Sequence, residues 1–373
     1  MRRKSLAIAA ITLAVVAVLL IFVLAALQVI PLLPEAEPRT IIVPDNYGTI
    51  QQAVDQANAG DTVFVRQGTY RNSYVHVNAS ISLMGDNGKT IVRGQISIIA
   101  SGVTVSGFTV EPEPPSFMSG ILIGPHISDI KITGNNVNGF YRGIATGSSQ
   151  TNQNLEISEN NIMNTDIGMA IQVSNGIISN NRLINNTSCG MVLDYCQDVT
   201  VKQNTITGGK TGLWLRWTGP FFVHENNITD CSVGVELGAR FGDSVVHNNN
   251  IARNQMGILL SDHPDNVGVG NKVYYNNVFD NEENVVIEAG LTDVVLWDNG
   301  LVGNYWSDYD GQGTYVIDED NVDYHPLTQQ VDISTAAPEP QSETLLLTIA
   351  VIAAVSVLVI GVGLLVYFKK RKR

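Results

Sequence analysis

The stretch ITGNNV at residues 132–137 decides the fold, because the chain repeats it six more times. The later copies are ISENNI at 157–162, ISNNRL at 178–183, VKQNTI at 201–206, VHENNI at 223–228, VHNNNI at 246–251 and VYYNNV at 273–278. The fourth position of every copy is an asparagine: Asn135, Asn160, Asn181, Asn204, Asn226, Asn249 and Asn276. Their successive separations are 25, 21, 23, 22, 23 and 27 residues. A regular period of this length is typical of a solenoid built from stacked repeats.

A second phrase follows the same period: a glycine, with mostly aliphatic residues one and three positions later. The glycines are Gly120, Gly143, Gly168, Gly190, Gly212, Gly234 and Gly257. Alternation with a period of two indicates short strands that have one buried face. Each period therefore holds two or three short strands, which are too few to bury a core alone.

Stacking solves this problem, because equivalent strands of successive periods then lie side by side as parallel sheets. A leucine-rich repeat has a similar period, but its LxxLxL spacing of leucines is absent here. We therefore predict an all-β fold, a single-stranded right-handed parallel β-helix of about ten or eleven coils spaced roughly 4.8 Å apart.

The repeated asparagine has a physical role in this fold. Asparagine tolerates the left-handed backbone that a bend requires, and its amide can bond to the same residue one coil away. The seven asparagines are thus predicted to form a structural ladder. An open stack also needs protected ends. The apolar residues Ile50, Ala53, Val54 and Ala57 have helical spacing and predict an N-terminal capping helix.

The two ends of the chain predict membrane segments. Residues 1–34 join a basic tip to an uncharged run long enough to cross a bilayer. This run is a retained anchor or a long cleaved signal sequence, and its length favours the anchor. Residues 344–368 form a second apolar segment, followed by the basic tail 369–373 in a stop-transfer pattern.

The two apolar ends indicate how the domains are organised and on which side of the membrane each part lies. Between them lie the β-helix at 39–330, with a cap at each end, and a polar stalk at 331–343. The positive-inside rule places both basic ends in the cytoplasm if the first span is retained, and the β-helix outside the cell. The membrane is therefore one expected partner.

Charge and cysteine content restrict the function. The chain has 22 Lys and Arg against 35 Asp and Glu, and eight of its basic residues lie in the two end clusters. The exported part is strongly acidic, so nucleic acid is excluded as a partner. Cys189, Cys196 and Cys231 fit neither a redox pair nor a zinc site. We expect buried thiols, with one disulfide as the alternative in an oxidising exterior.

Three segments resemble a known family. VPDNYGTIQQAVDQANAGDTVFV at 43–65, followed by RQGTY, resembles the opening of pectin-lyase-like β-helices. The NN repeats resemble those of the NosD-like periplasmic copper-binding family, which is also grouped among carbohydrate-binding and sugar-hydrolase (CASH) domains. WDNGLVGNYWSDY at 297–309 and IDEDNVDYHPL at 317–327 resemble the closing segment of surface-anchored archaeal members. The resemblance implies a periplasmic or surface role, carbohydrate or envelope contacts, and a link to copper, but it transfers no catalytic signature.

One face of the predicted solenoid is a candidate ligand-binding surface. Residues two and four positions after each repeat glycine point outward, and in the later coils they change from small or aliphatic residues to aromatic and charged ones. Tryptophan beside arginine and carboxylate is a common way to bind sugars, through ring stacking and hydrogen bonds. The predicted ligand-binding residues are Trp214, Arg216, Trp217, Arg240, Asp262 and His263. The alternative is a solvated face whose charges pair across coils.

Catalysis is a second hypothesis for the same face. Asp194 and Glu236 lie two coils apart on one predicted sheet, so their backbones would be roughly 10 Å apart. That separation is compatible with an inverting glycoside hydrolase, whose two carboxyl groups act as acid and base. Asp194 and Glu236 are thus weak catalytic candidates.

Two sets of residues are candidate metal ligands. His224 and His247 occupy the same repeat position in adjacent coils, where two imidazoles could share a copper ion, but a third ligand is not evident. The carboxylates near the end surround glycine turns that suit calcium, although their spacing is not that of an EF-hand. These residues are Asp308, Asp310, Asp318, Asp320 and Asp323.

The sequence thus predicts a membrane-anchored extracellular β-helix that binds carbohydrate or cell-envelope polysaccharide. The alternatives are a polysaccharide-cleaving hydrolase or lyase, and a NosD-like copper-handling or purely structural surface protein. No cofactor is required by the sequence; calcium and copper are the candidates.

Overall fold

The computed structural model describes residues 37–113, 118–147, 152–217, 219–238, 242–261, 270–288 and 295–337. The chain divides after Arg39 into two units, and the strands of the described residues belong to the second. The predicted membrane segments at 1–34 and 344–368, the basic tail 369–373 and residues 338–343 of the stalk lie outside the described residues. Within the described part of the chain, no helix is long and apolar enough to cross a membrane.

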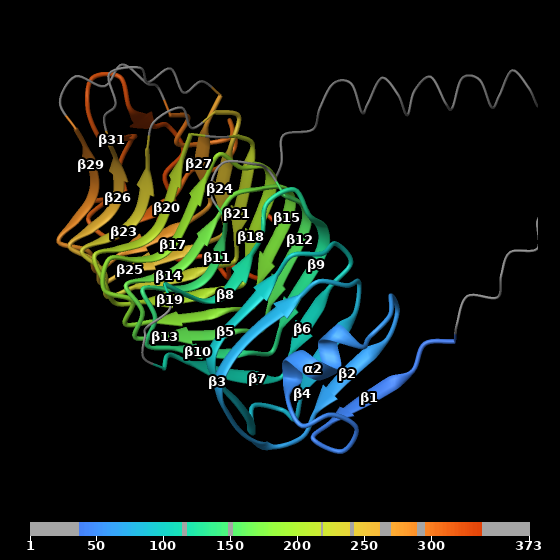
Figure 1. The fold of residues 1–373 in the computed structure, drawn as a ribbon. Coiled ribbons are helices and arrows are strands. Elements are labelled where there is room, and N and C mark those ends of the chain that lie inside the picture. Colours follow the sequence, from blue (N-terminus) through green and yellow to red (C-terminus); the bar gives the residue numbers. More distant parts are fainter. Residues whose placement is uncertain are drawn as a thin grey trace, which may run out of the picture. The chain divides into compact units, whose positions relative to one another are not determined.

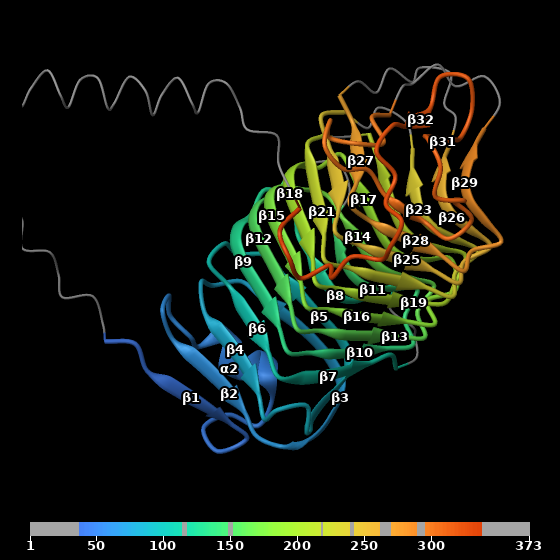
Figure 2. The same ribbon diagram turned by 180° about the vertical axis from the view of Figure 1, so that it is seen from behind.

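The second unit is a parallel β-solenoid, as the repeat predicts (Figure 1). Its first sheet has 11 strands, one from each coil. Figure 2 shows β9, β12, β15 and β18 of this sheet side by side in chain order. The strands are β1 (Thr40–Val43), β2 (Thr62–Val65), β4 (Ser82–Gly85), β6 (Thr104–Ser106), β9 (Ser128–Thr133), β12 (Asn152–Ser158), β15 (Val173–Ser179), β18 (Gln197–Lys202), β21 (Phe221–His224), β24 (Val245–His247) and β27 (Lys272–Tyr274).

The second sheet has 19 strands in two columns, joined where β3 (Gly68–Val77) and β5 (Thr90–Ile98) run through both. The first column continues with β7 (Phe108–Glu111), β10 (Asn136–Asn138), β13 (Asn161–Met163), β16 (Arg182–Ile184), β19 (Thr205–Thr207), β22 (Asn227–Thr229), β25 (Asn250–Ala252), β28 (Asn277–Phe279) and β30 (Tyr305–Trp306). The second continues with β8 (Ser119–Ile123), β11 (Arg142–Thr146), β14 (Ile167–Ile171), β17 (Cys189–Asp194), β20 (Thr211–Arg216), β23 (Val233–Leu237), β26 (Met256–Leu260) and β29 (Glu283–Ile287).

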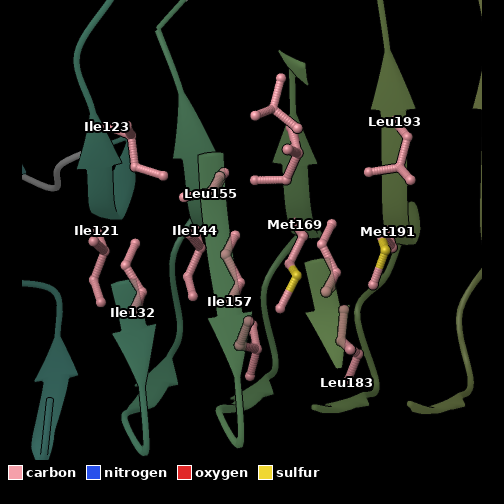
Figure 3. Close-up of a cluster of buried hydrophobic side chains, with 14 of the residues drawn as sticks. Ile121, Ile123, Ile132, Ile144, Leu155, Ile157, Met169, Leu183, Met191 and Leu193 are labelled. Carbon is pink, nitrogen blue, oxygen red and sulfur yellow. The ribbon is translucent and has the colours of Figure 1, made fainter. Parts of the chain in front are cut away.

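The core lies between the sheets and consists of aliphatic residues in register. Ile132 aligns with Ile157 and then with Ile178, and all three are fully buried. Figure 3 shows Ile132 and Ile157 beside Ile144 and Met169 of the facing sheet. Methionine and branched aliphatic side chains thus fill the core together.

The corner after the first sheet holds the asparagine ladder. Nδ2 and the backbone nitrogen of Asn204 both donate to Oδ1 of Asn226, at 3.0 and 2.9 Å. Oδ1 of Asn204 accepts the same two bonds from Asn181, at 3.0 and 2.9 Å. Both atoms of each amide are therefore used, and Asn204 has no exposed surface.

The left-handed backbone at this corner is not at the ladder asparagine, as the sequence had suggested, but one residue earlier. Glu159, Asn180 and Gln203 have φ angles of 59°, 56° and 56°. The residue before the ladder makes the bend, which leaves the asparagine free to point its amide into the coil. The ladder also extends beyond the seven repeats, because Asn276 donates to Oδ1 of Asn304 at 2.9 Å.

The C-terminal end of the stack is covered by specific contacts. At the last coil, Asn304 donates its backbone N–H to Asp323 at 2.7 Å, and the buried Trp306 donates its indole N–H to the same carboxylate at 2.9 Å. The hairpin of β31 (Tyr315–Val316) and β32 (Val322–Asp323) carries this carboxylate. Beyond it, Val331 exchanges two bonds of 2.8 Å with the side chain of Asn277.

At the first coil, a short helix, α2 (Ile50–Asp55), packs against β1, β2 and β3. It begins after Thr49, whose hydroxyl accepts the N–H of Gln52 at 3.2 Å, and it buries Ile50 and Val54. The capping role expected for this helix stays a prediction.

We predict that Asn204→Ala destabilises the solenoid by about 3 kcal/mol, because it leaves the buried backbone N–H of Asn181 without an acceptor and removes the bonds that Nδ2 of Asn204 donates to Ile178 and Lys202. The matched control is Asn227→Ala, since Asn227 is exposed and accepts one bond from Asn250 at 2.7 Å. The control is expected to change the free energy of unfolding by less than about 0.5 kcal/mol. Chemical denaturation of both variants measures the difference, and equal effects would contradict a structural role of the ladder.

Candidate ligand-binding cleft

The strand register places the predicted functional residues on one outward face. Trp214 aligns with Val192 in the preceding coil and with Glu236 in the next. Arg216 aligns with Asp194. These side chains come from β17, β20 and β23, and the alternation along each strand turns them away from the core.

A repeat glycine in each strand holds these coils close together. A Cβ atom added at Gly212 would lie 2.6 Å from the carbonyl oxygen of Gly234. Only glycine permits this approach of the two backbones. The outward residues two and four positions later are therefore fixed on a closely spaced surface.

Trp214, Arg216 and Asp194 form a connected group. The guanidinium carbon of Arg216 lies 4.1 Å from the centroid of the Trp214 ring. Nη2 of Arg216 lies 3.3 Å from Oδ2 of Asp194. The flat guanidinium is thus held between an aromatic face and a carboxylate, an arrangement that fixes both side chains.

Several polar atoms of this group are buried without a hydrogen-bond partner. Within the described residues they are Nε1 of Trp214, Nε of Arg216, Oδ1 of Asp194 and, nearby, Nε of Arg142. Leaving such an atom unpaired costs about 1–3 kcal/mol. Four of the eight such atoms among the described residues thus belong to this group, where a polar ligand could supply the missing bonds.

Arg142, Asp194 and Arg216 line a cavity of about 160 Å³, whereas Trp214 is not among its lining residues. A cavity on the order of 150 Å³ is large enough for one six-membered ring. Its walls combine apolar and polar side chains: Arg142, Thr146, Ile167, Ala170, Ile171, Gln172, Val192, Asp194 and Arg216.

The sequence did not point to Arg142, Thr146 or Gln172. Gln172 could have been found, because it lies four positions after Gly168 in the column of Asp194 and Arg216. Arg142 directly precedes Gly143, a position outside the two columns that the repeat marked as outward. No sequence feature singled it out.

An aromatic pair lies at the corner next to the cavity. The ring of Trp217 stacks with that of Tyr195 at a centroid distance of 6.0 Å and an interplanar angle of 20°. Tyr195 is 56% exposed and directly follows Asp194, although the sequence did not single it out. The other predicted ligand-binding residues, Arg240, Asp262 and His263, lie outside the described residues.

The two catalytic candidates have different surroundings. Asp194 lines the cavity, where burial raises its pKa and Arg216 opposes the rise. Glu236 lies beside Trp214 and accepts a bond from the Thr211 hydroxyl at 3.3 Å, and burial raises its pKa as well. The pair remains a hypothesis for an acid and a base.

The predicted metal ligands have other partners. The rings of His224 and His247 stack at 5.3 Å, and that of His247 stacks on Tyr274 at 5.5 Å. Nδ1 of His224 lies 3.0 Å from Glu225, and Nδ1 of His247 lies 2.7 Å from Asn248. This column lies on the first sheet, away from the cavity lining.

The carboxylates of the closing segment accept hydrogen bonds within that segment or from the last coils. Asp323 accepts bonds from Asn304 and Trp306, and Asp308 accepts the hydroxyl of Tyr315 at 3.0 Å. Asp310 and Asp318 accept backbone N–H groups two residues later. For Asp320, the structure adds no ligand role. Within the described residues, no three His, Cys, Asp or Glu side chains could hold a metal ion together, so calcium lacks support.

The three cysteines are free and buried, as expected. Burial raises the pKa of Cys196 and of Cys231 to about 12. These thiols stay protonated at neutral pH and are poor nucleophiles and poor metal ligands.

A parallel β-solenoid with a polar cleft on the outward face of one sheet defines the class of pectin-lyase-like β-helix proteins. Within that class the chain belongs to the NosD family, because the family described as "Periplasmic copper-binding protein (NosD)" matches residues 54–311. No match is found among the curated proteins. The archaeal, surface-anchored subtype suggested by the closing segment stays a prediction.

Solved structures share the fold. The Dettilon tailspike protein (gp208) is 13% identical with a TM-score of 0.56, over 69% of this chain and 62% of the tailspike, so the chain spans less than two thirds of it. Alginate lyase from Paenibacillus sp. str. FPU-7 is 11% identical with a TM-score of 0.51, over 70% and 94%. The A-module of mannuronan C-5 epimerase AlgE6 from Azotobacter vinelandii is 17% identical with a TM-score of 0.54, over 66% and 74%. These identities show the fold alone.

Among the residues that the structure describes, none form the copper centre that the family description implies. His224 and His247 supply two imidazoles, each with one ring nitrogen in contact with a neighbouring side chain. Lys202 and Tyr274 occupy the equivalent positions in the adjoining coils, and among the described residues no third ligand joins the pair.

We predict that Glu236→Gln raises the free energy of unfolding at pH 7. Burial raises the pKa of Glu236, so its ionisation opposes folding above the ordinary pKa of a glutamate, and glutamine removes that cost. Below that pKa, both folded and unfolded wild type are protonated and the advantage should vanish. Thermal unfolding at pH 4 and pH 7 tests this, with the exposed Glu159→Gln as the control. A variant less stable than wild type at pH 7 would contradict the argument.

Proposed function

We propose that this protein is an exported β-helix protein that binds carbohydrate or cell-envelope polysaccharide in the cleft around Trp214, Arg216 and Asp194. The observation that carries the proposal is the set of buried polar atoms without partners at the cavity. A sugar hydroxyl both donates and accepts hydrogen bonds, so a carbohydrate could satisfy the carboxylate oxygen and the N–H groups together.

Aromatic surface beside the polar atoms supports a sugar ligand. Sugar rings have apolar faces that stack on aromatic rings, while their hydroxyls bond to the surroundings. Trp214 lies against Arg216, and the stacked residues Tyr195 and Trp217 directly follow the lining residues Asp194 and Arg216. A neutral apolar ligand would leave the polar atoms unpaired, and the described part of the chain offers no group of three ligands for a metal ion.

The location belongs to the proposal as well. The family description is of a periplasmic protein, which agrees with an exported solenoid. The apolar segments 1–34 and 344–368 would anchor it, with both basic ends in the cytoplasm if the first is retained. In this arrangement α2 closes the first coil.

We predict that Trp214→Phe weakens glycan binding about tenfold, because it keeps a ring but removes the indole N–H. Trp214→Ala should weaken it further, since the support of Arg216 is lost as well. Phe222→Ala is the control, because Phe222 is 41% exposed on the other sheet. Binding of purified protein to a polysaccharide panel measures the effect. If no polysaccharide binds, or if Phe222→Ala is as harmful, the proposed site is wrong.

Cleavage of the bound polysaccharide is the second candidate function. It is favoured by the raised pKa of both Asp194 and Glu236 on the face of the cleft, because a catalytic acid needs such a shift. Product analysis of every bound polysaccharide separates the two functions. New reducing ends or unsaturated ends that disappear with Glu236→Gln would establish an enzyme, whereas binding without products supports a binding protein.

A further inference from the structure

We infer that the ligand of this cleft is an acidic polysaccharide, whose carboxylate or sulfate groups meet Arg142 and Arg216. This inference rests on the proposed function and adds the chemical class of the sugar. It is carried by the balance of donors and acceptors at the cavity, by the charges of the two arginines and by their separation along the solenoid.

Donors outnumber acceptors among the unpaired atoms of the cleft. Two N–H donors belong to residues that line the cavity, Nε of Arg142 and Nε of Arg216, and a third, Nε1 of Trp214, belongs to a residue stacked on Arg216. A single one, Oδ1 of Asp194, is an acceptor. A ligand that satisfies this set must therefore offer more acceptors than donors. Carboxylate and sulfate groups do so, since their charged oxygens accept several bonds and donate none.

The charges around the cavity also favour an anionic ligand, although the chain as a whole is acidic. The chain carries a formal net charge of −13, but this cavity is lined by two arginines and one carboxylate. Arg216 is paired with Asp194, as Arg66 is with Asp45 and Arg253 with Asp230. Within the described residues no carboxylate pairs with Arg142, so its charge is available to a ligand.

The spacing of the two arginines suits a polymer. Arg142 lies in β11 and Arg216 in β20, with β14 and β17 between them. Three coil steps correspond to roughly 14 Å along the solenoid axis. Arg142 aligns with Thr211, five residues before Arg216, so the two backbones are also offset along the strands. A single ring fills the cavity, but a chain that crosses the coils obliquely could place charged groups of successive sugars near both arginines.

The test compares matched polysaccharides that differ only in charge. Hyaluronan, gellan and alginate are each paired with their carboxyl-reduced forms, and dextran sulfate is paired with dextran. We expect purified full-length protein to bind at least one charged form about tenfold more tightly than its neutral counterpart. We also expect this preference to fall as salt rises. The pair that responds distinguishes carboxylate from sulfate.

Three variants locate the preference. Arg142→Gln and Arg216→Gln should each reduce the ratio of charged to neutral binding, whereas Arg253→Gln, which changes a surface arginine outside the cavity, should leave the ratio unchanged. Asp194→Asn should tighten binding of the charged form, because it removes a repelling carboxylate. A neutral sugar that donated to Asp194 would instead be bound more weakly by this variant.

The outcomes distinguish a failure of the acidic-ligand inference from a failure of the proposed function. Equal binding of charged and neutral forms in every pair would overturn the acidic ligand and leave the proposed function standing. A charge preference that Arg253→Gln reduces as much as Arg142→Gln does would also overturn it, because the preference would then arise from the general surface. Absence of any binding across the panel would overturn the proposed function itself, and with it the inference.

Discussion

The amide-to-amide hydrogen bond of the asparagine column is the interaction on which the rest of the structure depends. Each amide oxygen accepts from both the backbone and the side chain of the asparagine one coil earlier, as at Asn226 and Asn204. Inside a fully buried corner these bonds have no competition from water, so a slip of one residue would leave several donors unpaired. The ladder thereby fixes the register of every coil on the next. Once register is fixed, residues at one place in the period must form columns.

The cleft is a consequence of these columns. Gln172, Asp194 and Arg216 form one outward column, and Val192, Trp214 and Glu236 form its neighbour. Each strand contributes one or two side chains, so the site exists only when several coils are correctly stacked. A ligand that meets several coils therefore depends on the same register that the ladder enforces, although no ladder residue lines the cavity.

Local periodicity made most of the fold predictable. The period, the short strands, the parallel stacking and the ladder column all follow from residues that repeat, because identical positions have identical surroundings. The sequence did not show that the bend lies one residue before the asparagine, as at Gln203, or that Asn304 continues the ladder outside the NN phrase. In the cleft, the repeat marked Trp214 and Arg216, but burial and missing partners are properties of several coils together. Arg142 therefore became a candidate only through the structure.

The end of the ladder shows why an acidic residue in this protein need not be a metal ligand. The last amide of the ladder, Asn304, donates its N–H₂ to the backbone oxygens of Val273 and Trp297, so its backbone N–H is the donor that still needs an acceptor. Asp323 supplies that acceptor: its two oxygens accept N–H groups from Asn304, Trp306 and His325. Burial raises its pKa, while these three donors oppose the rise by favouring the charged form. A carboxylate that seemed suited to calcium is thus the acceptor that closes the solenoid.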